Sequence, residues 1–293
     1  MMKTFGIILI GLALLCGILY GVLAALARPA GRHPFFSHEG ILVIAHRGGG
    51  GLWPENTMYA FARVVELGAD IIEMDVHSTL DGELVVIHDD TMDRTTDGTG
   101  RVQEFTLAQL KELDAGYTWT PDNGKSFPFR SRGLTVPTLA EVFTAFPDIA
   151  MNIEIKQFQP SIIAPLSRLI RDCKMTERVL IASVDTNTLR EFRRVCPQVA
   201  TSAGEQETRS FYRMHLARLG RLCKAPAHAF QVPQYSGDRE VVTRSFLKAA
   251  HGRNMEVHVW TINDAEDMRR LMSMGVDGIV TDYPDRLLTI LGR

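Results

Sequence analysis

The chain has 293 residues, and its 32 Lys and Arg side chains nearly balance 34 Asp and Glu side chains, for a formal net charge of −2. This balance provides no basic surface, so nucleic-acid binding has no electrostatic support and we expect no nucleic-acid partner. The length suits one large α/β domain, since an α/β barrel commonly occupies about 250 residues.

The first feature along the chain is an uncharged apolar segment, residues 5–27. A helix needs about 20 apolar residues to span a bilayer, whereas the apolar part of a secretory signal usually has about 7 to 15. We therefore expect an uncleaved single-pass transmembrane anchor with its linker in residues 1–32, and cleavage after Ala27 is the alternative. Lys3 precedes the segment and Arg28 and Arg32 follow it, so the side of the membrane is left open.

The second feature is an apolar run, residues 41–45, that ends at His46-Arg47 and four glycines, residues 48–51. The run predicts a short buried strand, and the glycines predict a turn after it. Glycines allow backbone N–H groups to approach an anion, and the planar guanidinium of Arg47 matches phosphate oxygens. The alternative is a strand-to-helix turn in which the glycines only relieve crowding.

A second strand is predicted over residues 70–77, where apolar residues alternate with Glu73, Asp75 and His77. A strand places these three side chains on one face. Two carboxylates about 7 Å apart on a buried strand repel each other unless a cation lies between them. Oxygen ligands suit Mg²⁺ or Ca²⁺ better than zinc. An edge strand with a solvated acidic face is the alternative, and the apolar neighbours disfavour it.

The Asp81-Gly82 pair that follows is a two-residue hairpin signal. Such a turn folds His88 back toward the acidic strand. Together with His46, it would supply the acid and the base that cleavage of a P–O ester bond requires. Either Asp89 or Asp90 could orient His88.

Residues 151–156 alternate in the same way and place Asn152, Glu154 and Lys156 on one face. Glu154 would complete a set of three metal-binding carboxylates, and Lys156 could neutralise a phosphate oxygen. A structural Glu–Lys pair on a half-buried strand is the alternative.

Taken together, these motifs resemble the ordered signature of the glycerophosphodiester phosphodiesterase family. The matching segments, which span residues 41–288, are His46-Arg47-Gly48, Pro54-Glu55-Asn56-Thr57, Glu73-x-Asp75, His88-Asp89, Glu154-Ile155-Lys156 and Trp260-Thr261-Ile262-Asn263. The resemblance implies a barrel enzyme that hydrolyses glycerophosphodiesters to an alcohol and glycerol 3-phosphate with a divalent cation, Mg²⁺ or Ca²⁺.

The resemblance also implies a role for individual side chains. It makes His46 and His88 the acid/base pair, Arg47 a phosphate ligand, Glu73, Asp75 and Glu154 the metal ligands, and Lys156 and Trp260 residues of the substrate pocket. No fixed family residue corresponds to His77, so we treat it as an uncertain pocket residue.

The whole chain predicts a (β/α)8 TIM barrel over residues 40–293. Eight parallel strands are expected at 41–45, 71–76, 151–155, 179–183, 199–203, 229–232, 257–260 and 278–281, and amphipathic helical stretches at 55–67, 138–146, 160–173, 186–195, 240–252 and 265–274. Active sites of such barrels lie at the carboxyl ends of the strands. The run at 84–87 is excluded, because a two-residue turn cannot join parallel strands. It opens an insertion over about 84–137.

The sequence leaves several alternative functions open. A membrane anchor would favour a lysophospholipase D acting on lysophospholipids or N-acyl-lysophosphatidylethanolamines. A phospholipase C-like lyase would form a cyclic phosphate. A zinc amidohydrolase would require His-x-His where this chain has His46-Arg47-Gly48. A binding protein on an inactive barrel would be expected to have lost an acid or base. The sequence does not specify the oligomeric state.

Overall fold

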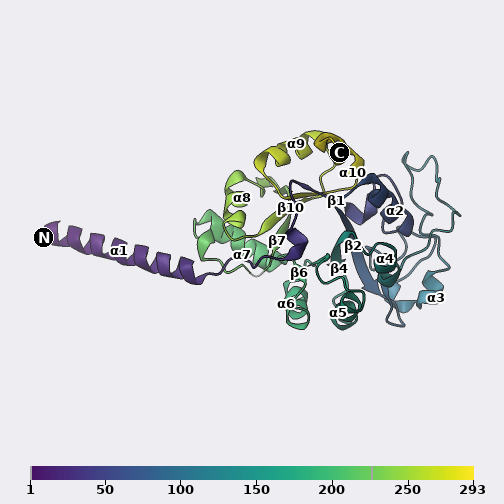
Figure 1. The fold of residues 1–293 in the computed structure, drawn as a ribbon, viewed down its shortest axis with the longest axis horizontal. Coiled ribbons are helices and arrows are strands. Elements are labelled where there is room, and N and C mark those ends of the chain that lie inside the picture. The colour runs from purple at the N-terminus through teal and green to yellow at the C-terminus, as the bar shows by residue number, and fades with distance from the viewer. Residues whose placement is uncertain (1, 226) are drawn as a thin grey trace.

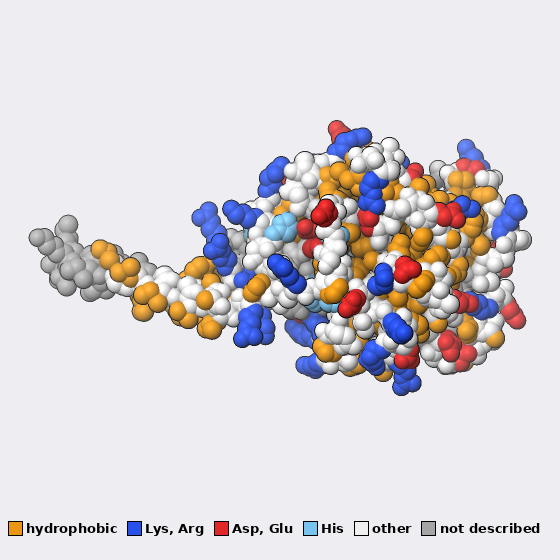
Figure 2. All heavy atoms as spheres, viewed as in Figure 1, with side chains coloured by type: hydrophobic (Ala, Val, Ile, Leu, Met, Phe, Trp, Pro, Cys, Tyr) orange, Lys and Arg blue, Asp and Glu red, His pale blue; other side chains and the backbone are white. Residues whose placement is uncertain are grey.

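The structure is a computed structural model that describes residues 2–225 and 227–293. It consists of a barrel and one N-terminal helix, α1 (Met2–Leu26), which extends away from the barrel at the purple end of the chain (Figure 1). The segment after α1 is attached to the barrel, because Ala30 N–H donates to Arg253 O at 2.8 Å. On the face in Figure 2, basic and acidic side chains are interspersed over the barrel.

The prediction of a transmembrane anchor at residues 5–27 is wrong. The uncharged segment does form a helix. Among the helices in the described ranges, however, none combines the length and the apolar character that crossing a membrane requires. A run without charges is necessary for a membrane span but does not by itself establish one. The single-pass membrane localisation was inferred from the same run, and this prediction is therefore also wrong.

The predicted barrel is confirmed. Its parallel strands are β1 (Leu42–Ala45), β2 (Ile71–Ser78), β4 (Ala150–Ile155), β5 (Val179–Ala182), β6 (Ala200–Thr201), β7 (Ala229–Pro233), β10 (Glu256–Trp260) and β11 (Gly278–Thr281). They are ordered β6-β5-β4-β2-β1-β11-β10-β7. The two ends of this sheet meet through a parallel bridge between Ser202 and Ala229, next to a 2.8 Å hydrogen bond from Ala203 N–H to Ala229 O.

Helices surround the strands (Figure 1). They are α2 (Met58–Leu67), α4 (Leu139–Ala145), α5 (Ile163–Asp172), α6 (Thr186–Val195), α7 (Glu205–Leu216), α8 (Arg244–His251), α9 (Ala265–Met274) and α10 (Pro284–Leu291). Helices α7 and α10 were not predicted. In α7 the signal is weak, because Phe211 is its one fully buried residue among those described.

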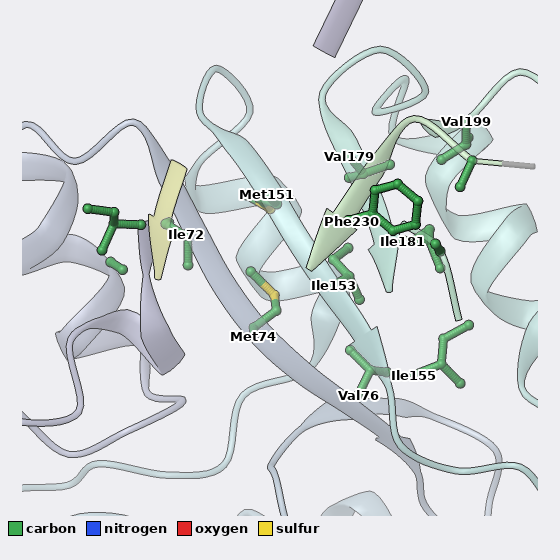
Figure 3. Packing of buried hydrophobic residues seen from close by; sticks show 14 of the residues in the cluster. Ile72, Met74, Val76, Met151, Ile153, Ile155, Val179, Ile181, Val199 and Phe230 are labelled. Atoms are coloured by element: carbon green, nitrogen blue, oxygen red, sulfur yellow. The ribbon is translucent and has the colours of Figure 1, made fainter. Parts of the chain in front are cut away.

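Strand periodicity divides the barrel residues into two sets. Ile72, Met74 and Val76 of β2 belong to the large core between strands and helices, together with Ile153 and Ile155 of β4 (Figure 3). The residues between them point into the barrel. At the amino ends of the strands these inward residues are apolar and pack with Phe35. Toward the carboxyl ends they are polar, and this polar end forms the site described below.

The predicted hairpin is present, but its loop has three residues, 80–82, and not two, because Thr79 N–H donates to Glu83 O at 2.9 Å and Gly82 N–H donates to Thr79 O at 3.0 Å. Strand β3 (Leu84–Val86) pairs antiparallel with β2, and Val76 lies opposite Val86. Between β3 and α4 the chain forms two short helices, η3 (Val102–Glu104) and α3 (Leu107–Leu110). This region has a small core of its own, made of Val85, Ile87, Met92, Val102, Leu110, Ala115 and Val136.

Candidate active site

A cavity of about 1120 Å³ opens at the carboxyl ends of the strands. Its lining includes nearly all the site residues expected from the sequence, namely His46, Arg47, Glu73, His88, Glu154, Lys156 and Trp260. Asp75 is buried beneath the surface of the cavity, with 1% of the residue exposed. His77 is also buried and is not part of the described cavity lining; its Nε2 lies 3.1 Å from the backbone oxygen of His88.

Three carboxylates cluster at the base of this cavity. Glu73, Asp75 and Glu154 each have an oxygen within 4.8 Å of the other two. The strands explain the cluster, because β2 and β4 are neighbours and their register pairs Asp75 with Glu154. Burial and the adjacent charge of Asp75 raise the pKa of Glu73 to about 8. Burial acts in the same sense on Asp75, but the charges of Lys156, His88 and Arg47 outweigh it and lower the pKa of Asp75.

The atoms around the carboxylates fit a hard divalent cation. Asn152 lies opposite Glu73 in the sheet, and its Oδ1 is buried. Asn56 donates to Asp75 at 3.1 Å, and its Oδ1 is buried as well. Within residues 2–225 and 227–293, neither Oδ1 has a hydrogen-bond partner. Carboxylate and amide oxygens are the ligands that Mg²⁺ and Ca²⁺ prefer, and these orphaned acceptors are consistent with such an ion.

Lys156 lies between two of the carboxylates. Its Nζ is 2.9 Å from Glu154 Oε2 and 3.3 Å from Asp75 Oδ1. The Glu–Lys pair considered as a structural alternative is therefore present, but it lies in the cavity wall. Burial lowers the pKa of Lys156, while the charges of Asp75 and Glu154 raise it more strongly, so the side chain stays charged.

His46 follows β1 and is supported by an acidic side chain from the other end of the chain. Its Nδ1 lies 2.7 Å from Oδ1 of Asp282, which follows β11. Asp282 Oδ2 accepts a 2.7 Å hydrogen bond from Asn263 Nδ2. Burial lowers the pKa of His46, but the hydrogen bond to Asp282 and the charge of Glu73 raise it above its ordinary value. Because a carboxylate only accepts, His46 donates through Nδ1, and Nε2 remains for proton transfer.

His88 has a similar support within its own loop. Its Nδ1 lies 2.5 Å from Oδ1 of Asp89, one of the two aspartates that the sequence predicted could orient His88. The other candidate is Asp90, and its Oδ1 lies 4.0 Å from Nδ1 of His77. The two histidines therefore line one cavity, and each is held through Nδ1 by its own aspartate.

Arg47 contacts the acidic side chains around it. Its backbone N–H donates to Glu73 Oε2 at 2.7 Å, and its Nη1 donates to Glu55 Oε1 at 2.9 Å. Of the glycines that follow, Gly48 has the packing role that the simpler alternative predicts. A Cβ at Gly48, where φ is +77°, would lie 2.8 Å from the ring of Phe61.

Sequence reasoning did not select three polar side chains of the site. Asp282 lies outside every motif that was used, and so does Arg94, which bonds to Asp89. Asn263 belongs to the Trp260–Asn263 motif, but nothing in the sequence indicated that it would support Asp282. The Trp260–Asn263 motif could therefore have indicated Asn263 as a site residue, whereas no sequence motif indicated Asp282 or Arg94.

An eight-stranded α/β barrel with an acidic cluster and two aspartate-supported histidines at the carboxyl ends of its strands has the architecture of a barrel hydrolase. A family model described as the glycerophosphoryl diester phosphodiesterase family matches residues 46–286, and the chain belongs to that family. It is a phosphoric diester hydrolase. The alternatives of a zinc amidohydrolase and an inactive binding protein do not fit this assignment.

Individual relatives agree with the family. The chain is 38% identical over 258 residues to a glycerophosphodiester phosphodiesterase of Caldanaerobacter subterraneus, covering 86% of this chain and 98% of that one. It is 24% identical to a lysophospholipase D of Mus musculus, covering 85% and 86% of the two chains. A phosphodiesterase of Oleispira antarctica, solved with the product sn-glycerol 3-phosphate, shares the fold with a TM-score of 0.72 and 24% identity over 89% of this chain and 100% of that one.

Proposed function

We propose that the chain hydrolyses glycerophosphodiesters to an alcohol and glycerol 3-phosphate, with a divalent cation and with His46 and His88 as acid and base. The observation that carries the proposal is the presence of both histidines in the wall of one cavity, with the acidic cluster at its base. The relative from Oleispira antarctica, which has the same fold, was solved with that product.

In this proposal each group has a distinct task. Arg47 and Lys156 attract the phosphate with their positive charges. One histidine takes a proton from the attacking oxygen, and the other gives a proton to the oxygen of the leaving alcohol. A Mg²⁺ or Ca²⁺ ion held by Glu73, Asp75 and Glu154 would supply charge neutralisation for the phosphate oxygens.

We also propose that residues 84–137 form an insertion of the 40–293 catalytic domain that borders the mouth of the cavity. In support, Trp119 Nε1 donates to the backbone oxygen of Gly50 at 3.1 Å, which ties the segment to the glycine turn after His46. His88 belongs to the same segment.

A lysophospholipase D is the second candidate, and the size of the cavity favours it. Ligand pockets typically have about 300 to 1,000 Å³, and this one has about 1120 Å³. Away from the carboxylates, its wall includes Val184, Tyr212, Leu216 and Val241. Such a wall could hold an acyl chain in addition to the phosphate group.

The test uses the purified full-length chain with glycerophosphocholine and with lysophosphatidylcholine, each with Mg²⁺ or Ca²⁺. Glycerol 3-phosphate from the first substrate supports the main proposal, and lysophosphatidic acid from the second supports the alternative. Phosphorus NMR would reveal a cyclic phosphate, the product of a phospholipase C-like lyase. Full activity after His46→Ala or His88→Ala would refute the acid/base assignment, and full activity in EDTA would refute the metal.

A further inference from the structure

Arg94 joins two acidic side chains that come from different parts of the site. Its Nε donates to Asp89 Oδ2 at 2.6 Å, and its Nη2 donates to Asp89 Oδ1 at 3.2 Å. The same guanidinium donates to Glu55 through Nη1 at 2.8 Å and through Nη2 at 2.7 Å. Both carboxylates are thus held in two-point contacts, which fix direction as well as distance.

Each of the two carboxylates has a second partner in the cavity wall. Asp89 binds Nδ1 of His88, and Glu55 binds Nη1 of Arg47. The result is a continuous chain of contacts that runs from His88 through Asp89, Arg94 and Glu55 to Arg47. Burial raises the pKa of Asp89, but its hydrogen bonds to Arg94 and His88 lower it to about 2, so Asp89 stays an acceptor for His88 at neutral pH.

The two histidines differ in how they are supported. Asp282, the partner of His46, directly follows β11 and is held by the neutral side chain of Asn263. His88 and Asp89 lie beyond the end of β3, outside regular secondary structure. The backbone of that loop is attached to β2, because Ile87 N–H donates to Asp75 O at 3.0 Å and His77 Nε2 lies 3.1 Å from His88 O. The contact through Arg94 to Glu55 adds a connection from the side chain of Asp89 to the Arg47 side of the site.

We propose that Arg94 is a positioning residue, which holds His88 in its catalytic orientation by fixing Asp89 against Glu55. The inference rests on the proposed acid/base role of His88. Lysine cannot replace Arg94, because a single ammonium group does not reproduce two parallel pairs of hydrogen bonds.

The experiment compares Arg94→Met and Arg94→Lys with wild type, using the substrate that the preceding assay identifies. Displacement of a reacting group by about 1 Å can cost about 100-fold in rate. We expect kcat to fall about 10- to 100-fold in both variants, with KM changed less than about threefold because Glu55 still binds Arg47. The matched control is Arg63→Met: both arginine side chains are 46% exposed, and Arg63 forms a surface pair with Glu66.

A double variant distinguishes positioning from a general structural effect. If Arg94 acts through His88, Arg94→Met should slow the His88→Ala enzyme by less than about threefold, because the group that it positions is already absent. Exogenous guanidinium should restore part of the rate of Arg94→Ala but not that of His88→Ala.

Three results would overturn the inference. The first is an unchanged kcat in Arg94→Lys. The second is a double variant whose loss of kcat equals the product of the losses in Arg94→Met and His88→Ala, and the third is a fall in the kcat of Arg63→Met as large as that of Arg94→Met. If His88→Ala alone retains full activity, the acid/base proposal fails instead, whatever the Arg94 variants show.

Discussion

Replacing Asp282 with asparagine should reverse the hydrogen bonding of His46. Asp282 accepts from His46 Nδ1 through Oδ1 and from Asn263 Nδ2 through Oδ2. The side-chain amide of Asn263 cannot rotate to exchange its oxygen and nitrogen, because its Oδ1 accepts hydrogen bonds from Thr281 Oγ1 and from the backbone N–H of residue 282. The new amide must therefore present its oxygen to Asn263 and its NH₂ group to His46. His46 Nδ1 would then accept, and the proton would move to Nε2.

The size of the effect on the rate follows from the proposed role of His46 in acid–base catalysis. General acid–base catalysis contributes about 10²- to 10⁴-fold, and each factor of ten corresponds to about 1.4 kcal/mol. With the proton on the wrong nitrogen, we expect Asp282→Asn to lower kcat/KM by about 10²- to 10⁴-fold. Loss of the carboxylate also removes a contribution that raises the pKa of His46, so that pKa should fall.

The assay is the initial rate of glycerol 3-phosphate formation, with circular dichroism to verify folding. Asp277→Asn is a matched control, because Asp277 also pairs with a histidine: its Oδ2 lies 2.8 Å from Nε2 of His251, outside the cavity. We expect this control to keep the wild-type rate. A value of kcat/KM for Asp282→Asn within threefold of wild type would refute the reasoning about the proton.

Three further predictions concern the metal, the pH and the packing. Glu73→Gln should weaken Mg²⁺ binding at least about tenfold in calorimetry, and unchanged binding would remove Glu73 from the ligand set. At the amino end of β10, burial raises the pKa of Glu256, but hydrogen bonds from His258 and His38 lower it to about 2. The contribution of Glu256 to stability is therefore complete above pH 4.5, which is near the pKa of the unfolded chain, and it is lost as the pH falls toward 2. Urea unfolding should show wild type losing more stability than Glu256→Gln between pH 5 and 3, and parallel losses would contradict this. Gly48→Ala should destabilise the fold by about 1 to 3 kcal/mol through overpacking and positive φ, and an unchanged urea midpoint would show that the loop adapts.

The acidic cluster could be predicted because it depends on strand periodicity alone. Alternation puts Glu73, Asp75 and Glu154 on inward faces, and barrel order makes their strands neighbours. The Asp-Gly turn likewise brought His88 back toward β2. These features depend on backbone geometry, which local sequence determines strongly.

The supports of the two histidines could not be predicted in this way. His46 and Asp282 are 236 positions apart, and Arg94 and Glu55 are 39 apart. Such pairs depend on side-chain directions after the barrel has closed, and no local pattern encodes them. The prediction of a membrane anchor was wrong for a different reason, because a run of uncharged residues is not sufficient for a transmembrane span.

The pairing of β1 with β11 has a consequence for how the enzyme comes into being. These are the first and last strands of the barrel, and Asp282 follows the last one. His46 is translated 236 residues before its partner Asp282, which directly follows the strand that closes the ring. A growing polypeptide on the ribosome therefore carries both histidines before the ring of strands can close and before His46 can bind Asp282.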